Sequence, residues 1–347
     1  QSRIKMLYKL LRYVVMAKKI NFSRIAELAG VSTTTVSHIF NGNAERHRIS
    51  DITKKKVLAI ATQFADQEHI RRAIIRASLT RTIGVIVPDM SNFSFAMFLH
   101  KLEMISSHQG IQIIISCSHY NPAQEVNAIN NLLERKVDGI ITITSLDDDV
   151  LYSKVSIKTP VLLYDRFISH SQLPFVSCES ICSVTKLISE KAKLFDEFWF
   201  LGGDIQISTI RERLIGFRKG LKKAGLKLNK EWIVYDKYHE NLGYHLMEKI
   251  TKKIGRLPKA IFTPSGNLLE GVLLYLKDNK VAQNEIYLCS YDYNMYHDFL
   301  FYDVDILSQD YEQLARHCFI NIQHLINKHA VEHRITRVPP KLIVSSR

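Results

Sequence analysis

Residues 20–42 read INFSRIAELAGVSTTTVSHIFNG, and this stretch decides how the N-terminal part of the chain folds. The apolar face of a short first helix is expected at four residues, Ile25, Ala26, Leu28 and Ala29. Gly30 allows the sharp turn that ends this helix. Ser32 is a good N-cap for a second helix, with Thr35 three residues on. The buried face of that second helix is expected at Val36, Ile39 and Phe40, and Asn41-Gly42 ends it.

A third helix is expected to begin at Ser50-Asp51, which can cap it, and to run to about Phe64. Its inward-facing residues are Val57, Leu58, Ala61 and Phe64. Three short helices with a tight turn between the first two predict a helix-turn-helix domain over residues 18–65. A set of helices that only pack together, as in many small α-domains, is the alternative.

The positive charge of the chain is concentrated at its N-terminal end. The formal net charge is +13, and residues 1–82 hold 16 Lys and Arg against 5 Asp and Glu. The remaining 265 residues hold 31 basic and 29 acidic side chains. A small basic domain on a nearly neutral body is typical of proteins that bind the phosphate backbone of nucleic acids. A solvated basic tail is the other interpretation.

Residues 1–17 precede this domain and are treated as an N-terminal extension of doubtful biological meaning. Residues 6–17 are apolar, but Lys9 and Arg12 interrupt them. The apolar run is too short and too charged to span a bilayer. It is also a poor signal peptide, since no small-residue cleavage site follows. We therefore expect a cytoplasmic protein.

From Thr82 onward, apolar β-rich runs alternate with helical stretches. The expected strands are 82–88, 111–117, 137–144, 160–164, 197–203, 232–235, 259–263 and 286–290. Such alternation predicts parallel sheets covered by helices on both faces, and this length of chain predicts two lobes. The five cysteines are odd in number and form no CxxC motif, which favours reduced thiols over disulfides or a zinc site.

Several stretches resemble the lactose-repressor (LacI/GalR) family. They include IAELAGVSTTTVSHIFNG, RTIGVIVPD, RKVDGIITITS, PVLLYDR, RERLIGF and AIFTPSGNLLEGVLLY. The resemblance covers residues 18–344 and is greatest to repressors of sucrose operons, then to fructose-responsive repressors. It implies a body, residues 82–347, with the two-lobed α/β fold of type I periplasmic binding proteins. The first lobe is expected over 82–165 and 293–323, and the second over 166–292 and 324–347.

The resemblance also assigns roles in DNA binding. The second helix of the motif enters the major groove, where Thr33, Thr34 and His38 are expected to read base edges. The residues expected to contact phosphates or to cap the helix are Ser32, Thr35, Ser37 and Asn41.

Residues 66–81 match the hinge helix of the family but depart from its pattern. The family usually has Tyr-x-Pro-Asn, then Ala-x-x-Leu, and its Leu wedges into the minor groove. Here Ile75 is the matching apolar wedge. Arg72 replaces the small Ala that lets two hinge helices approach closely. This departure motivates the alternative of a degenerate repressor with weak operator specificity.

A sugar site is expected between the lobes, at the carboxyl ends of the strands. Sugars require carboxylates that accept from hydroxyls, an arginine that orients ring oxygens, and an aromatic face. The positions that match the family's site are Ser94, Phe95, Asp165, Arg213, Tyr238, Ser265, Asp292 and Tyr311. Taken singly, each has a structural alternative, such as a local ion pair between Asp165 and Arg166.

These observations predict a dimeric transcription repressor of a sugar-utilisation operon, with sucrose or fructose as the expected sugar. Fructose or a fructose phosphate is the first candidate effector that would release the protein from its operator. We expect no enzyme activity, cofactor or metal site, because the chain has no P-loop, no GxGxxG after a strand, no GxSxG and no HExxH. A periplasmic-type sugar-binding protein, a small-molecule enzyme on the same lobes and a degenerate repressor with weak operator specificity are the alternatives.

Overall fold

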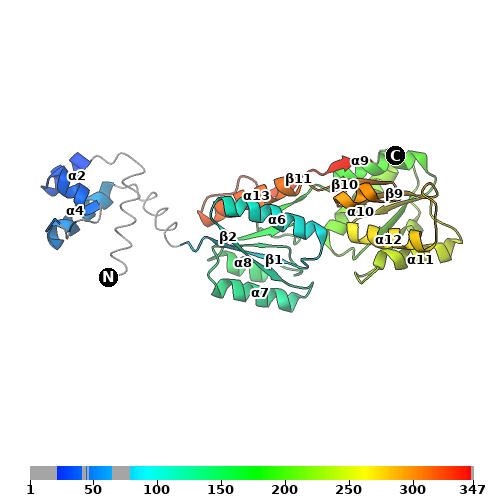
Figure 1. Ribbon diagram of the computed structural model, residues 1–347, viewed down its shortest axis with the longest axis horizontal. Coiled ribbons are helices and arrows are strands. Elements are labelled where there is room, and N and C mark those ends of the chain that lie inside the picture. The colour runs from blue at the N-terminus through cyan, green and yellow to red at the C-terminus, as the bar shows by residue number, and fades with distance from the viewer. Residues whose placement is uncertain (1–21, 41–43, 45–46, 65–78, 345–347) are drawn as a thin grey trace. The chain divides into compact units, whose positions relative to one another are not determined.

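The computed structural model describes residues 22–40, 44, 47–64 and 79–344 of the chain. Contacts divide the chain into two compact units, with the division between Thr80 and Arg81 (Figure 1). No helix among the described residues is long and apolar enough to cross a membrane.

The N-terminal unit contains three helices, α2 (Phe22–Ala29), α3 (Thr33–Phe40) and α4 (Asp51–Phe64). Gly30 ends α2 with a left-handed backbone, φ 67°, a conformation that favours glycine. The Ser32 hydroxyl accepts a hydrogen bond from the Thr35 backbone N–H at 3.0 Å, and Ser50 caps α4 in the same way. The expected turn and both expected caps are therefore present.

The core of this unit is formed by seven buried residues, Ile25, Ala26, Ala29, Val36, Ile39, Ala44 and Val57. Leu28 was expected on the buried face of α2, but its side chain is 42% exposed. At about 100° per residue, Leu28 lies roughly 100° around the helix from the centre of the stripe formed by Ile25, Ala26 and Ala29. A helix of eight residues buries only that stripe.

The first lobe of the body is built on a six-stranded sheet with strand order β11-β5-β4-β3-β1-β2. All neighbouring strands in this sheet pair in parallel. The strands are β1 (Thr82–Val87), β2 (Gln112–Cys117), β3 (Gly139–Thr142), β4 (Val161–Tyr164), β5 (Phe175–Cys178) and β11 (Ile335–Val338). The helices are α6 (Phe93–His108), α7 (Pro122–Glu134), α8 (Val150–Ser156) and α13 (Tyr311–Ile326).

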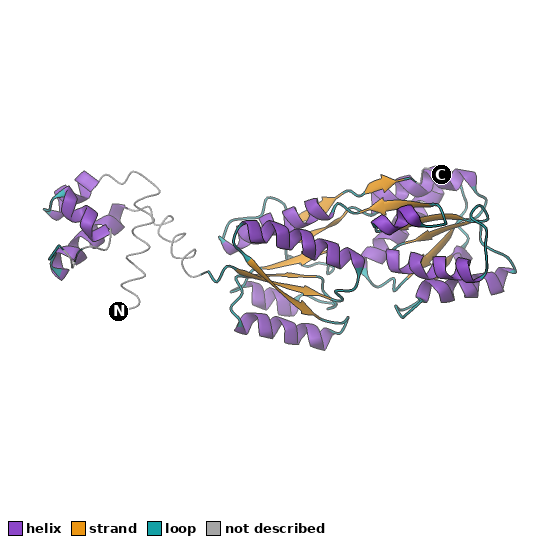
Figure 2. Ribbon diagram, viewed as in Figure 1, coloured by secondary structure: helices purple, strands orange, loops and turns teal. Residues whose placement is uncertain are grey.

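The second lobe repeats this plan with strand order β12-β10-β9-β8-β6-β7, parallel except where β12 pairs with β10 (Figure 2). Its strands are β6 (Trp199–Gly202), β7 (Ile233–Tyr235), β8 (Ala260–Thr263), β9 (Tyr287–Tyr291), β10 (Val304–Ser308) and β12 (Lys341–Ile343). Its α-helices are α9 (Ile181–Lys191), α10 (Ser208–Ala224), α11 (Leu242–Ile254) and α12 (Gly266–Asp278). Three short 3₁₀ helices complete it: η1 (Ala192–Leu194), η2 (Lys230–Trp232) and η3 (Met295–Phe299).

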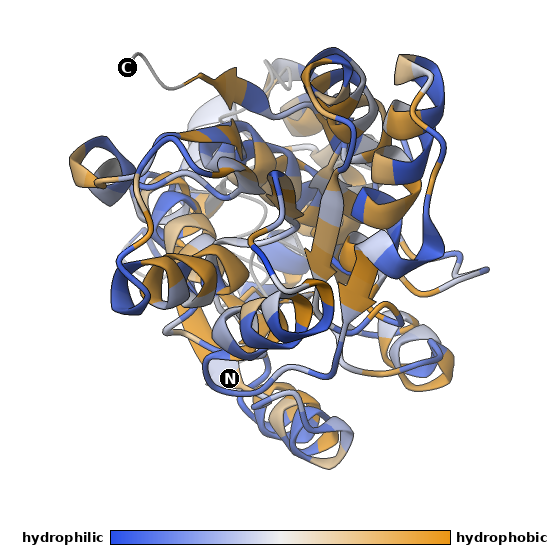
Figure 3. Cartoon of the chain, turned by 90° about the vertical axis from the view of Figure 1, so that its right-hand side faces the viewer, coloured by the Kyte–Doolittle hydropathy of each residue, from blue (hydrophilic) through white to orange (hydrophobic). Residues whose placement is uncertain are grey.

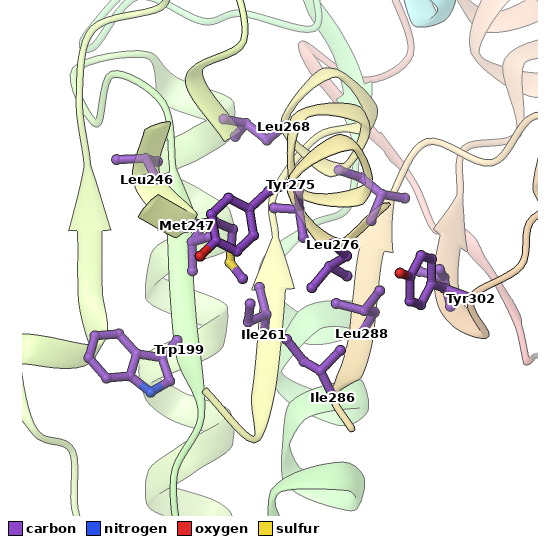
Figure 4. Packing of buried hydrophobic residues seen from close by; sticks show 14 of the residues in the cluster. Trp199, Leu246, Met247, Ile261, Leu268, Tyr275, Leu276, Ile286, Leu288 and Tyr302 are labelled. Carbon is purple, nitrogen blue, oxygen red and sulfur yellow. The ribbon is translucent and has the colours of Figure 1, made fainter. Parts of the chain in front are cut away.

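Buried apolar residues fill both faces of the second sheet. Figure 3 shows mainly hydrophobic strands inside the body, whereas the helices carry both hydrophobic and hydrophilic residues. On one face, Ile261 and Leu288 of the sheet pack with Met247 of α11 and Leu276 of α12 (Figure 4). The sheet is thus held between helices, as alternating β and α segments predict.

The chain crosses between the lobes three times, as expected, but at other places. The crossovers are the dipeptides 179–180, 309–310 and 339–340, each between an element of one lobe and an element of the other. The expected boundaries differ from these because β5 pairs with β4 in the first sheet and β10 pairs with β9 in the second. The C-terminal segment is also shared, since β11 joins the first sheet and β12 the second.

Candidate functional site

A polar pocket lies between the lobes at the carboxyl ends of the strands. Its volume is about 610 Å³, including the space open to solvent. Asp165 directly follows β4 of the first lobe, and Asp292 directly follows β9 of the second. Both aspartates have left-handed backbones, with φ 61° and 71°. Such conformations are uncommon outside glycine, and they turn the chain where each side chain reaches the pocket.

Seven of the eight positions expected to contact a sugar line this pocket: Ser94, Phe95, Asp165, Arg213, Tyr238, Ser265 and Asp292. The eighth, Tyr311, lies behind the lining. Its hydroxyl is 2.9 Å from the Ser94 hydroxyl and donates to Asp292 Oδ1 at 3.4 Å. Tyr311 and Ser94 belong to the first lobe and Asp292 to the second, so this contact joins the lobes at the back of the pocket.

Arg213 is the most enclosed charged group of the pocket, with 4% of its surface exposed. Its Nη1 donates to the Pro264 carbonyl at 2.5 Å, and its guanidinium lies 3.7 Å from the centroid of the Tyr291 ring. Burial alone would lower the pKa of Arg213, but the charges of Asp292 and Asp165 raise it, so the guanidinium stays charged. Its Nε has no protein partner among the described residues.

The Asp165 carboxylate makes no hydrogen bond or ion pair with another described residue. Burial raises the pKa of this carboxyl, and the nearby guanidinium groups of Arg213 and Arg166 only partly oppose the rise. The local ion pair with Arg166 that sequence left open is therefore not formed. An acceptor without a protein partner can take hydrogen bonds from a bound molecule.

Asp292 is held more firmly than Asp165. Gln309 donates from Nε2 to Asp292 Oδ1 at 2.6 Å, and Gln309 itself lies on the second crossover. The Asp292 side chain therefore connects the pocket directly to a segment about which the lobes can rotate.

Tyr238 and Ser265 form the outer part of the pocket. The Tyr238 hydroxyl is 3.3 Å from the Ser265 hydroxyl, and Tyr238 is 39% exposed. A Cβ at Gly203 would lie 2.2 Å from the Tyr238 ring, so only glycine leaves room for this ring. Gly203, directly after β6, thus also shapes the outer part of the pocket.

Sequence reasoning missed other lining residues: Asn92, Tyr120, Tyr164, Ile207, Thr209, Ile210, Asn267 and Gln309, besides Arg166. Position relative to a strand could have indicated two of them. Gln309 directly follows β10, and Arg166 comes second after β4. Tyr164 is the last residue of β4, and the others lie on loops or first helical turns, whose approach to the pocket depends on how the lobes meet.

The expected DNA-reading residues lie on or next to α3. Thr33 and Thr34 are exposed, while Thr35, Ser37 and His38 are half-buried. Ser32 caps the helix, one of the two roles expected for it. The remaining expected contacts, Asn41, Arg72 and Ile75, lie outside the described residues.

Comparisons with known proteins agree with this architecture. Residues 22–65 match the bacterial regulatory proteins of the lacI family. Residues 80–343 match the periplasmic binding proteins and sugar binding domain of the LacI family. The chain is 40% identical over 316 residues to the sucrose operon repressor of Klebsiella pneumoniae, covering 91% of this chain and 95% of that one. It is 30% identical over 303 residues to the fructose operon regulatory protein of Vibrio cholerae, covering 84% of this chain and 89% of that one.

Solved structures share the fold. The Cra transcriptional dual regulator from Pseudomonas putida, in complex with fructose 1-phosphate, has a TM-score of 0.70 at 24% identity, covering 77% of this chain and all of that one. The lac repressor dimer, bound to operator and an anti-inducer, has a TM-score of 0.68 at 18% identity, covering 92% of this chain and 96% of that one. The chain therefore belongs to the LacI family of bacterial transcription regulators, as its sequence motifs predicted.

Proposed function

We propose that this protein represses a sugar-utilisation operon and leaves its operator when a sugar fills the pocket between the lobes. The observation that carries the proposal is that Arg213, Asp165 and Asp292 line one pocket at the lobe junction. Two carboxylates and a buried guanidinium provide the acceptors and donors that a polyhydroxyl ligand requires. The helix-turn-helix unit provides the DNA contact.

Fructose and fructose phosphates are the effectors to test first. Phe95 offers an apolar ring to sugar C–H groups, and Asp165 offers an acceptor to hydroxyls. Arg166 lines the pocket, with its guanidinium 5.2 Å from the centroid of the Tyr120 ring, and its Nε has no protein partner among the described residues. An arginine so placed can bind a phosphate. Substitution of Arg166 should therefore weaken binding of a phosphorylated effector more than binding of a neutral sugar.

Binding of the sugar is proposed to change the angle between the lobes. Asp165 belongs to one lobe and Arg213 and Asp292 to the other, so a ligand that contacts all three favours the closed arrangement. Crossovers of two residues each allow such rotation. A coupling of about 1–3 kcal/mol between sugar and operator would change operator affinity about 5- to 150-fold.

The active species is proposed to be a homodimer on a near-palindromic operator in the cytoplasm. One short recognition helix reads too few bases for specificity, and a two-fold dimer presents two such helices. Tyr296, Phe299 and Phe301 are 69%, 79% and 63% exposed and follow one another closely along the chain. Exposed apolar side chains so close together are typical of an interaction surface.

The test is fluorescence anisotropy of the full-length protein on near-palindromic operator duplexes and on scrambled duplex. It is run at fixed, near-physiological salt with fructose, fructose 1-phosphate, sucrose, glucose or no sugar. We expect preferential operator binding that one of the fructose compounds weakens. Equal, salt-sensitive binding to every duplex with no sugar effect would contradict the proposal.

A further inference from the structure

We infer that His47 is a positioning residue for DNA recognition, because it holds the imidazole of His38 in one orientation on the DNA-facing side of α3. The inference rests on the proposed function and concerns a residue that the sequence motif did not indicate. The rings of His38 and His47 are stacked, with centroids 3.5 Å apart and an interplanar angle of 17°.

His38 lies on the side of α3 that is free for contact with DNA. It follows the exposed Thr34 by four residues, so the two share one face of the helix. Val36 and Ile39 of the same helix are fully buried and fix its other face against the core. Packing against the core therefore sets the orientation of α3, but it does not set the orientation of the His38 ring.

The segment that carries His47 is anchored at both ends. Ala44 is 2% exposed, Ile49 packs against the same core, and the Ile49 backbone N–H donates to the Ala44 carbonyl at 2.9 Å. Between these anchors, His47 and Arg48 are exposed, and Arg48 has a left-handed backbone with φ 51°. Such a backbone is uncommon for arginine, and it turns the chain directly after His47.

Stacking restricts the His38 side chain but leaves its chemistry available. The contact covers one face of the ring, while both ring nitrogens lie at the edge. Neither histidine has a side-chain hydrogen bond with another described residue. A base edge can therefore meet a His38 ring whose rotation is already restricted, and less side-chain entropy is lost on binding.

The test starts from an operator that the unmodified full-length protein selects from random duplexes. Binding of His38→Ala, His47→Ala, His47→Phe and the double alanine variant is then measured, without sugar, on this operator. The same variants are measured on a panel with each base pair replaced in turn and on scrambled duplex. Phenylalanine keeps a flat ring for stacking and removes the nitrogens. His333→Ala, which removes an exposed imidazole from the body, is the matched control.

We expect His38→Ala to lower operator affinity about 5- to 150-fold, the range for loss of one base contact. His47→Ala should lose most of the same affinity at the same base positions, His47→Phe should restore it, and the double variant should be no weaker than His38→Ala. Scrambled duplex should bind all variants alike, which also shows that the domain is folded.

Several results would overturn the inference. Additive losses in the double variant would show that the two histidines act independently. An equal loss on operator and scrambled duplex would make His47 a phosphate contact, and failure of His47→Phe to restore affinity would assign the role to a ring nitrogen. Selection of no operator by the unmodified protein would overturn the proposed function as well, whereas an unchanged His47→Ala profile overturns only this inference.

Discussion

Arg337 on β11 of the first lobe and Glu212 on α10 of the second lobe form a two-point ion pair across the lobe junction. The distances are 2.7 Å from Nη2 to Oε1 and 2.8 Å from Nη1 to Oε2. The guanidinium also lies 5.0 Å from the centroid of the Phe175 ring. Since Glu212 precedes Arg213, α10 carries the inter-lobe carboxylate and the cation of the pocket side by side. A movement of α10 relative to the first lobe would therefore act on this ion pair.

Replacing Arg337 by Met is expected to destabilise the body by about 2–3 kcal/mol, because a buried Glu212 carboxylate loses its partner. The figure is below that for a fully buried pair, since the Arg337 side chain is 30% exposed. Urea unfolding of the full-length protein measures it. Lys252→Met, which breaks the exposed pair with Glu248, is the matched control and should cost under about 1 kcal/mol. Equal effects of the two variants would show that the inter-lobe pair contributes no more than a surface contact.

Asp292→Asn should weaken sugar binding and so shift release of the operator to higher sugar concentrations. The amide keeps the shape of the side chain but loses the charge that draws hydroxyl donors and balances Arg213. Sugar affinity is expected to fall about 10- to 150-fold, the value of a hydrogen bond to a charged group, while operator affinity without sugar stays unchanged. Titration calorimetry and anisotropy measure the two affinities. Glu248→Gln, on an exposed side chain of α11, is the control, and release of the operator by Asp292→Asn at an unchanged sugar concentration would exclude this carboxylate from the ligand site.

The sequence predicted correctly those features that depend on residues close together in the chain. The turn at Gly30 and the cap at Ser32 follow from local backbone chemistry, and both are present. The sequence did not indicate β5, which has four residues, or β12, which has three, and β12 pairs with β10 far back along the chain. The lobe boundaries therefore differed from those expected.

Only part of the pocket could be predicted from the sequence. Asp165 and Asp292 end strands, where residues of parallel sheets converge. The contact of Gln309 with Asp292 depends on the position of the second crossover. That position follows from strand pairing, which the hydrophobic periodicity of the sequence does not show. Stacking of His47 on His38 likewise depends on how the segment after α3 is anchored in the core.

Asp165→Asn should stabilise the protein without sugar and weaken sugar binding. Because burial raises the pKa of Asp165 in the folded state, that state binds the proton more tightly than the unfolded chain does. The contribution of Asp165 to stability is fully present below the ordinary value of 3.8 and is lost as pH rises through the raised pKa. The free energy of unfolding should therefore fall less in Asp165→Asn than in the unmodified protein over this window.

Urea unfolding at a series of pH values from below 4 to 7 measures this difference between the two proteins. With sugar at neutral pH, the unmodified protein should be the more stable of the two, since an ionised Asp165 accepts hydrogen bonds that an amide accepts less well. Parallel pH curves for the two proteins would contradict a raised pKa at this position.

Arg72→Ala should sharpen the preference for operator over scrambled duplex. In the family that this chain resembles, a small residue here permits two hinge helices to approach, and two arginines brought together repel each other. The substitution removes this repulsion and also one cation near the phosphates, which reduces non-specific binding and its salt dependence. Both effects raise the ratio of specific to non-specific affinity. Anisotropy at two salt concentrations measures that ratio, with Arg71→Ala as the control for charge alone. If the two alanine variants change the ratio equally, Arg72 acts only as a basic residue, and close approach of hinge helices is not what limits operator recognition.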